Sequence, residues 1–218
     1  MRQLYKIVIV GDGGVGKTTT IHNIFHYLQK KFPTVSYKSS QEGGDTDTTS
    51  IARTKFIDFH SICFTIHDQK VTWQIWDLQG QRFPSANAYT SLNPLDHITE
   101  TIVNHSDLIL LTFDSSNNAT YNELFREKGF FDLIRPHLTQ QQSVLLLASK
   151  TDLLESATKD PIAKMQTEYD FETVSFNNVY LENISLLSET ILSLLQLPEG
   201  NQTIASPHDE PVSLKVYR

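Results

Sequence analysis

Residues 11–18 read Gly11-Asp12-Gly13-Gly14-Val15-Gly16-Lys17-Thr18. An apolar run at residues 7–10 (IVIV) precedes it, and a stretch with helical spacing follows. Strand, glycine-rich turn and helix in this order are the context of a phosphate-binding loop. Gly11 and Gly16 allow the backbone to curl until its N–H groups face phosphate oxygens, and the start of the helix presents further N–H groups to the same anion. A plain connecting turn is the alternative, but it gives the Lys17-Thr18 pair no role.

The last residues of this loop carry its chemistry. Lys17 can reach the β- and γ-phosphates of a nucleotide, and the Thr18 hydroxyl can bind a Mg2+ ion that bridges them. We therefore predict that Lys17 is a catalytic and binding residue and that Thr18 is a metal ligand. The predicted nucleotide contacts of this segment are Asp12, Gly13, Gly14, Val15, Gly16, Lys17, Thr18 and Thr19.

A second segment with phosphate-site character is Trp76-Asp77-Leu78-Gln79-Gly80-Gln81, at the end of a strand that returns from a hairpin. Asp77 can hold the Mg2+ ion through a bound water, and the Gly80 N–H can contact a γ-phosphate. The pattern Asp-x-x-Gly is common by itself. Its position after a hairpin that follows a phosphate loop is what makes it informative here.

A third segment, Ser149-Lys150-Thr151-Asp152, follows another apolar strand and indicates the base. The Asp152 carboxylate can accept two hydrogen bonds from guanine, whereas adenine would leave it unpaired, and such a difference discriminates strongly between bases. The aliphatic stem of Lys150 can lie against the ring. A charged loop that caps the next helix is the alternative, and it would be preferred if the phosphate loop were absent.

Apolar spacing predicts an alternating β/α chain. Strands are expected at residues 4–10, 55–66, 71–76, 107–113, 143–148 and 171–176, and helices at 17–31, 119–137, 160–168 and 179–196. Residues 34–53 are expected to form a long polar loop, and residues 82–105 a polar segment with irregular helix. The predicted fold is the α/β, three-layer P-loop NTPase fold, with a six-stranded, mostly parallel sheet, one antiparallel edge strand and helices on both faces. The ligand is expected beyond the carboxyl ends of the strands, where all three segments fall.

Composition narrows the function classes. The 218 residues, 39% hydrophobic and 20% charged, are typical of one globular domain with extensions. The formal net charge of −7 argues against a nucleic-acid partner. The sequence shows no pattern typical of a signal peptide, a transmembrane segment, N-myristoylation or prenylation, and the single cysteine, Cys63, fits a reducing compartment. We expect a cytoplasmic monomer without a lipid anchor.

Over about residues 4–196 the chain resembles the Ras-like small GTPases, and the Rab branch most closely. GDGGVGKT, WDLQGQ and SKTD occur in the family's order, and residues 54–59 (TKFIDF) resemble the first switch of Rab proteins. The resemblance implies a G domain at residues 1–197, with an enlarged first-switch loop at about 33–53 and an extended second switch at about 82–105, followed by a polar tail at 198–218. It also implies that Thr54 binds Mg2+ and the γ-phosphate, that Gln81 orients the attacking water, and that Gly13 leaves room for Gln81.

Several positions depart from the family's pattern. The stretch from Thr18 to Thr54 is about twice the usual length, so Thr48 and Thr49 remain alternatives for the switch threonine. The aromatic residue that packs against the base is Phe32 or Tyr37, and Phe32 is preferred.

The guanine loops and the second switch also differ from the pattern. Ser149 replaces the usual Asn or Thr, Gln79 lies beside the switch glycine, and Arg82-Phe83 follow Gln81 one residue early. The last guanine loop falls at residues 174–176 (VSF), and its register is open. The predicted contacts of the two guanine loops are Ser149, Lys150, Asp152, Leu153, Ser175 and Phe176.

The expected function is a switch that binds GTP or GDP with Mg2+, hydrolyses GTP slowly and exposes its switch segments to effector proteins. An exchange factor and a GTPase-activating protein are expected as partners, and any membrane contact is expected to run through a partner protein. The alternative is a hydrolysis-deficient, GTP-binding scaffold subunit of a complex. Ser149-Lys150-Thr151-Asp152 disfavours a third possibility, a phosphotransferase or ATPase on the same loop.

Overall fold

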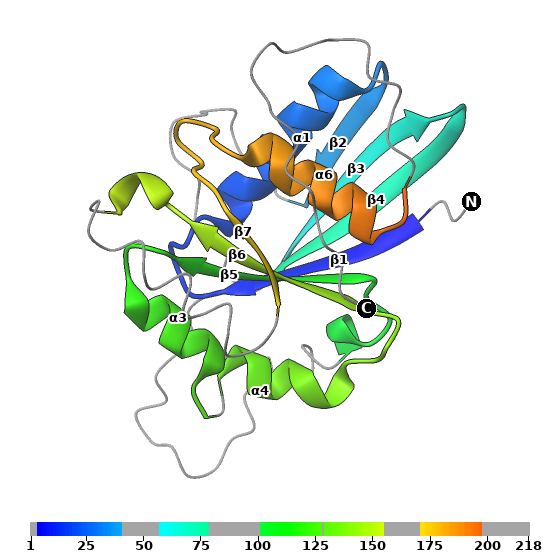
Figure 1. The fold of residues 1–218 in the computed structure, drawn as a ribbon. Coiled ribbons are helices and arrows are strands. Elements are labelled where there is room, and N and C mark those ends of the chain that lie inside the picture. The colour runs from blue at the N-terminus through cyan, green and yellow to red at the C-terminus, as the bar shows by residue number, and fades with distance from the viewer. Residues whose placement is uncertain (1–3, 41–56, 79–100, 128, 155–170, 198–218) are drawn as a thin grey trace.

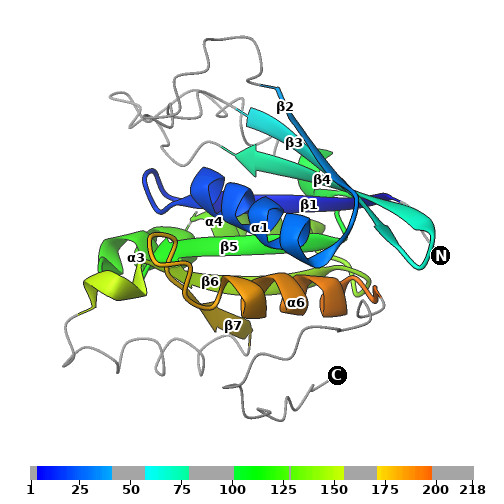
Figure 2. The same cartoon turned by 90° about the horizontal axis from the view of Figure 1, so that it is seen from above.

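The computed structural model describes residues 4–40, 57–78, 101–127, 129–154 and 171–197. Within these residues a seven-stranded sheet has helices on both faces (Figure 1). The strand order is β2-β3-β4-β1-β5-β6-β7, and Figure 2 shows the strands in this order. The predicted three-layer α/β architecture is therefore confirmed.

The centre of the sheet is parallel. It consists of β1 (Leu4–Gly11), β4 (Gln69–Leu78), β5 (Leu108–Asp114) and β6 (Ser143–Ser149), and β7 (Glu172–Ser175) extends it to one edge. β5 is buried along its whole length, and β1 is buried over residues 7–11. Their continuous apolar runs suit strands that are packed on both faces.

The predicted hairpin is present and forms the antiparallel part of the sheet. β3 (Ile57–Ile66) alternates between half-buried and buried residues and pairs with β4 along its full length. The turn consists of His67 and Asp68, with φ of 46° and 62°. Two successive left-handed residues twist a hairpin in the direction that its strands require.

The strand count is the main correction to the predicted fold. β2 (Val35–Ser39) lies within the stretch expected to be a loop, and it pairs antiparallel with β3 at the edge. Over the described residues the sheet therefore has seven strands instead of six, and the one strand reversed among them, β3, is not at the edge. Contacts with α1 (Lys17–Lys31) help to explain β2, because the Tyr37 ring stacks on Phe25 with centroids 4.9 Å apart.

The helices form two layers, each with its own hydrophobic core. α1 and α6 (Ile184–Leu194) contact each other on one face of the sheet, as Figure 2 shows. α3 (Asn118–Phe125), α4 (Phe130–Ile134) and the 3-10 turn η1 (Arg135–His137) lie on the other face. Among the described residues, no helix combines the length and apolar character that a membrane span requires.

Two helices differ from their predicted bounds. The single helix expected at residues 119–137 is divided between α3 and α4. Gly129 directly precedes α4, and glycine suits this position because a Cβ there would lie 2.7 Å from the Arg126 carbonyl oxygen. α6 begins at Ile184 rather than at residue 179, because Leu181 and Asn183 have left-handed φ of 59° and 58°. The helix predicted at residues 160–168 and the tail at 198–218 lie outside the described residues.

Candidate nucleotide-binding site

The structure brings the first and third predicted segments, and the described residues 76–78 of the second, to one edge of the sheet. Gly11 ends β1, and Ser149 ends β6. In register, Ile9 pairs with Asp77 of β4, and Asp114 at the end of β5 pairs with Ser149. The carboxyl ends of β1, β5 and β6 lie together at the left of Figure 1. A ligand beyond these ends would meet all three segments.

The phosphate loop has the unusual backbone that its glycines permit. Gly14 and Gly16 have left-handed φ of 75° and 96°. Position 11 requires glycine for a different reason, which is space: a Cβ there would lie 2.1 Å from the Thr112 carbonyl oxygen of β5. α1 begins directly after Gly16, so the amides of the loop and of the first helical turn lie close together. One loop amide, that of Gly13, donates to the Asp12 carboxylate at 2.6 Å.

Lys17 is held inside this loop. Its side chain is only 7% exposed, and its ammonium donates to the carbonyl oxygens of Gly11 and Asp12 at 3.1 and 3.0 Å. Burial lowers the pKa of Lys17, and the carboxylates of Asp77 and Asp12 partly oppose that shift. An ammonium has three N–H donors. Two of them donate to carbonyl oxygens of the loop, and the third can donate to a phosphate oxygen.

Thr18 and Asp77 fit the predicted Mg2+ site. The Thr18 hydroxyl donates to Asp77 Oδ2 at 2.5 Å, and the Asp77 side chain is fully buried. Hydroxyl and carboxylate oxygens are suitable ligands for Mg2+, which usually keeps several waters and uses few protein ligands. The two side chains therefore offer the metal one direct ligand and one partner for a bound water.

Ser149 supports the site from inside the protein. Its hydroxyl lies 2.7 Å from the Val15 carbonyl oxygen and 2.8 Å from that of Phe113, and the residue is 0% exposed. Ser115, which the sequence analysis did not identify, donates to the Ser149 carbonyl oxygen at 2.6 Å. The prediction of Ser149 as a direct nucleotide contact is therefore corrected, because its side chain is buried against the phosphate loop.

The guanine segment continues into the 3-10 turn η2 (Thr151–Leu153). The Lys150 ammonium pairs with Asp114 Oδ2 at 2.8 Å. Burial raises the pKa of Asp114, but hydrogen bonds from Lys150 and Ser116 outweigh that effect, and the net pKa is lowered. Asp152 and Leu153 are exposed, so the Asp152 carboxylate can reach a ligand at this edge.

Phe176 also differs from its predicted role. Its ring is 0% exposed within the core between the sheet and α6. Its amide donates to the Ala148 carbonyl oxygen at 2.9 Å, and its carbonyl accepts from the Thr151 amide at 3.4 Å. Ring and backbone are therefore engaged inside the protein, and Phe176 positions the guanine segment instead of contacting a base. Ser175 directly precedes it as the last residue of β7.

The sequence analysis did not identify Asn178, which lies two residues after the predicted last guanine loop (174–176). The Asn178 side chain donates to the Gly16 carbonyl oxygen at 3.3 Å and to Thr20 Oγ1 at 3.0 Å. The one signal in the sequence was the pair Asn177-Asn178 directly after the last predicted strand, because amide side chains there can bond to loop backbone.

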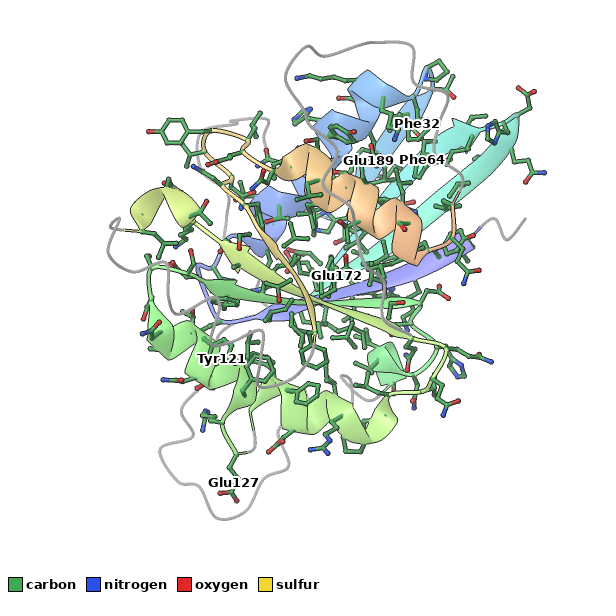
Figure 3. The ribbon with its side chains drawn as sticks, in the orientation of Figure 1. Phe32, Phe64, Tyr121, Glu127, Glu172 and Glu189 are labelled. Atoms are coloured by element: carbon green, nitrogen blue, oxygen red, sulfur yellow. The ribbon has the colours of Figure 1, made fainter. Side chains whose placement is uncertain are left out.

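Neither aromatic residue predicted to pack against the base fits that role. Phe32 follows the last residue of α1, which puts it about 20 Å from the phosphate loop at 1.5 Å per residue. It is 6% exposed and stacks on Phe64, with ring centroids 5.0 Å apart (Figure 3). The Tyr37 hydroxyl bonds to ring nitrogens of His22 and His60, at 2.9 and 2.6 Å. Both aromatic residues therefore help to pack α1 against the sheet.

The remaining predicted residues lie outside the described parts of the chain. These are Thr54, Gly80 and Gln81, together with Thr48 and Thr49 as alternatives to Thr54. Their roles stay predictions.

Comparisons with known proteins identify the family of this chain. The sequence model of the Ras family matches residues 6–185, which include all three segments. The Ras-related protein RABE1d of Arabidopsis thaliana is 27% identical over 99% of this chain and 85% of its own length. The GTP-binding protein YPTC5 of Chlamydomonas reinhardtii is 34% identical over 56% of this chain and 46% of its own length, and the Ypt/Rab-type GTPase Rab7 of Neurospora crassa is 25% identical over 98% and 92%. The chain thus belongs to the Ras family of small GTPases, with Rab and Ypt proteins among its relatives.

Proposed function

We propose that this protein is a molecular switch that binds GTP and GDP with Mg2+ and hydrolyses GTP slowly. The observation that carries the proposal is the 2.5 Å contact between Thr18 and Asp77, beside the buried ammonium of Lys17. A site for a metal-bound nucleoside triphosphate needs a hydroxyl, a carboxylate and an ammonium together. Segments far apart in the chain supply these groups at one edge of the sheet.

The proposed roles follow from the chemistry of each group. Mg2+, when bound, neutralises charge on the β- and γ-phosphates. Thr18 would hold it directly, Asp77 would hold it through a water, and Thr54 is the proposed further ligand. Lys17 and the amides of the phosphate loop bind the phosphate oxygens and stabilise the charge that develops on them. Gln81 orients the attacking water.

Guanine is the proposed base. Asp152 is exposed and can accept from N1–H and the exocyclic amine of guanine, whereas adenine would leave the carboxylate unpaired. The hydrogen bond from Ser149 to Val15 supports this proposal, because it fixes the guanine segment against the phosphate loop.

Partner proteins are part of the proposal. A slow hydrolytic rate calls for a GTPase-activating protein, and stable nucleotide binding calls for an exchange factor. Effector proteins are proposed to read the switch segments, and a partner is proposed to bring the protein to any membrane surface.

A second candidate function is a GTP-binding scaffold subunit that does not hydrolyse its nucleotide. One observation favours it, which is the presence of β2 within the predicted first-switch loop. The Ser40 amide donates to the Phe59 carbonyl oxygen at 2.9 Å, and the Phe59 amide donates to the Ser40 hydroxyl at 3.0 Å. These bonds fix part of the predicted first-switch loop to the sheet, whereas a switch must rearrange that loop.

Single-turnover hydrolysis distinguishes the two candidates. Purified protein loaded with GTP and Mg2+ is sampled over hours, and the nucleotide is separated by anion-exchange chromatography. The switch proposal predicts slow conversion to GDP by the wild type and at least tenfold slower conversion by Gln81→Leu. Equal retention of GTP by both forms over hours would favour the scaffold.

A further inference from the structure

One side chain, Asn178, attaches the loop after β7 to the phosphate loop. Its amide nitrogen donates to the Gly16 carbonyl oxygen at 3.3 Å and to Thr20 Oγ1 at 3.0 Å. Its amide oxygen accepts from Asn23 Nδ2 at 2.9 Å, and its backbone carbonyl accepts from the same nitrogen at 3.1 Å. Asn178 therefore bonds both to Gly16 of the phosphate loop and to the first turns of α1.

The backbone conformation of Gly16 and its lack of a side chain make room for this contact. Its φ is 96°, and a Cβ on this residue would lie 2.9 Å from Asn178 Nδ2. Its carbonyl oxygen also accepts from the Thr20 amide at 2.9 Å and the Thr20 hydroxyl at 2.8 Å. The peptide group that precedes Lys17 is thus fixed from the helix and from the loop after β7 together.

The loop that carries Asn178 is held by its own side chains. The Asn177 side chain is 1% exposed and accepts from the amides of Val179 and Tyr180 at 2.8 and 3.2 Å. Asn183 Nδ2 donates to the Ser175 carbonyl oxygen at 3.0 Å. Bonds of this kind build compact turns. The position of Asn178 is therefore set by the end of β7.

The same end of β7 is bonded to the guanine segment. Phe176 contacts Ala148 and Thr151 through its backbone, and Thr151 directly precedes Asp152. A continuous set of contacts thus leads from the guanine segment through Phe176 and Asn178 to Gly16, the residue before Lys17.

We propose that Asn178 is a positioning residue that holds the guanine segment and the phosphate loop in register, so that one nucleotide is bound by both at once. This inference rests on the proposed function. A ligand held at both ends leaves only when both ends release it, and correct spacing of the two ends raises its residence time. Loss of Asn178 should therefore speed release and weaken the preference for the correct base.

The first test measures release of a fluorescent GDP from the full chain in the presence of Mg2+. Asn178→Ala is expected to release GDP about tenfold faster, as the loss of one or two hydrogen bonds implies. Asn178→Asp keeps the size of the side chain but cannot donate to Gly16, and it is expected to release GDP as fast as Asn178→Ala. Val179→Ala is the matched control, because this side chain on the same loop is 72% exposed, and its release rate should equal that of the wild type.

A second readout separates positioning from general loss of stability. IDP lacks the exocyclic amine of guanine, so the wild type should bind it at least tenfold more weakly than GDP. Asn178→Ala should reduce this ratio, whereas a purely structural lesion would weaken both ligands equally. If Asn178→Ala does not fold, Asn178→Asp and Asn23→Ala carry the same comparison.

The outcomes distinguish this inference from the function on which it rests. Wild-type release rates in the Asn178 variants, or an unchanged GDP-to-IDP ratio, would overturn the positioning role while GDP binding stands. A wild-type protein that binds no guanine nucleotide would overturn the proposed function, and the inference with it.

Discussion

The Thr18 hydroxyl and the Asp77 carboxylate lie 2.5 Å apart, although 59 positions separate them in the chain. Parallel pairing of β1 with β4 creates this contact, because it brings the end of β4 level with the start of the phosphate loop. The contact makes Mg2+ dependence the first property to test.

Removal of Mg2+ should speed the release of GDP. We expect EDTA to accelerate release of a fluorescent GDP from the wild type by at least tenfold, since a metal held by Thr18 and Asp77 would link the phosphates to the protein. Thr18→Ala should release GDP quickly with or without EDTA. Thr34→Ala is the control, because the Thr34 hydroxyl bonds only to Thr65 in an exposed pair among the described contacts. A full EDTA effect in Thr18→Ala would contradict the assignment of this ligand.

Ser149→Ala should destabilise the fold as well as the site. The substitution removes the hydroxyl that lies between the Val15 and Phe113 carbonyl oxygens, and buried groups that lose a partner cost about 1–3 kcal/mol. Urea unfolding measures the loss. Ser36→Ala, at an exposed position of β2, should change the free energy of unfolding by less than about 0.5 kcal/mol. Equal stability of the two variants would show that Ser149 does not support the loop.

Phe32→Ala should lower the stability of the fold and leave nucleotide binding nearly unchanged. Truncation of a buried aromatic side chain costs about 3–5 kcal/mol of unfolding free energy, and Phe32 is packed against Phe64. The release rate of GDP from the folded protein should stay within about twofold of the wild type, because Phe32 lies far from the phosphate loop. Faster release at unchanged stability would instead support the predicted contact with the base.

His60 should make stability depend on pH. Burial lowers the pKa of His60 to about 4, with a further lowering by His22 and an opposing effect of Asp58. Since the unfolded histidine titrates near 6.5, the unfolded state binds more protons between about pH 6.5 and 4. The folded state should therefore lose up to about 1.4 kcal/mol per pH unit as the pH falls through this window, and keep its full stability above it.

Urea unfolding across this pH range measures the effect. His60→Gln cannot titrate, so its stability should fall less steeply with pH than that of the wild type. His67→Asn, in the exposed hairpin turn, is the control and should follow the wild type. Parallel curves for wild type and His60→Gln would show that His60 is not kept neutral by the fold.

The sequence predicted the parallel core and the phosphate loop because their signals are local. Continuous apolar runs mark β1 and β5, and the order of glycines, lysine and threonine fixes a strand-turn-helix unit. The position of Asp77 at the carboxyl end of a strand then followed from the hairpin pattern.

The missed features depend on contacts between distant parts of the chain. β2 is a short polar strand, and the hydrogen bonds of Tyr37 with His22 and His60 hold it against α1 and β3. Phe32 was assigned to the base by analogy, whereas its burial depends on the length of α1. Asn178 reaches Gly16 across 162 positions, and such a contact has no signature in the spacing of residues.

Equilibrium binding of GDP, ADP and XDP to the wild type and to Asp152→Asn, in the presence of Mg2+, tests directly whether the site binds a guanine nucleotide. The wild type should prefer GDP over the other two by at least a hundredfold, because only guanine pairs fully with the Asp152 carboxylate. Asp152→Asn should lose affinity for GDP and gain affinity for XDP. Equal affinities in the wild type, or an unchanged preference in Asp152→Asn, would contradict the claim that the three segments bind one guanine nucleotide.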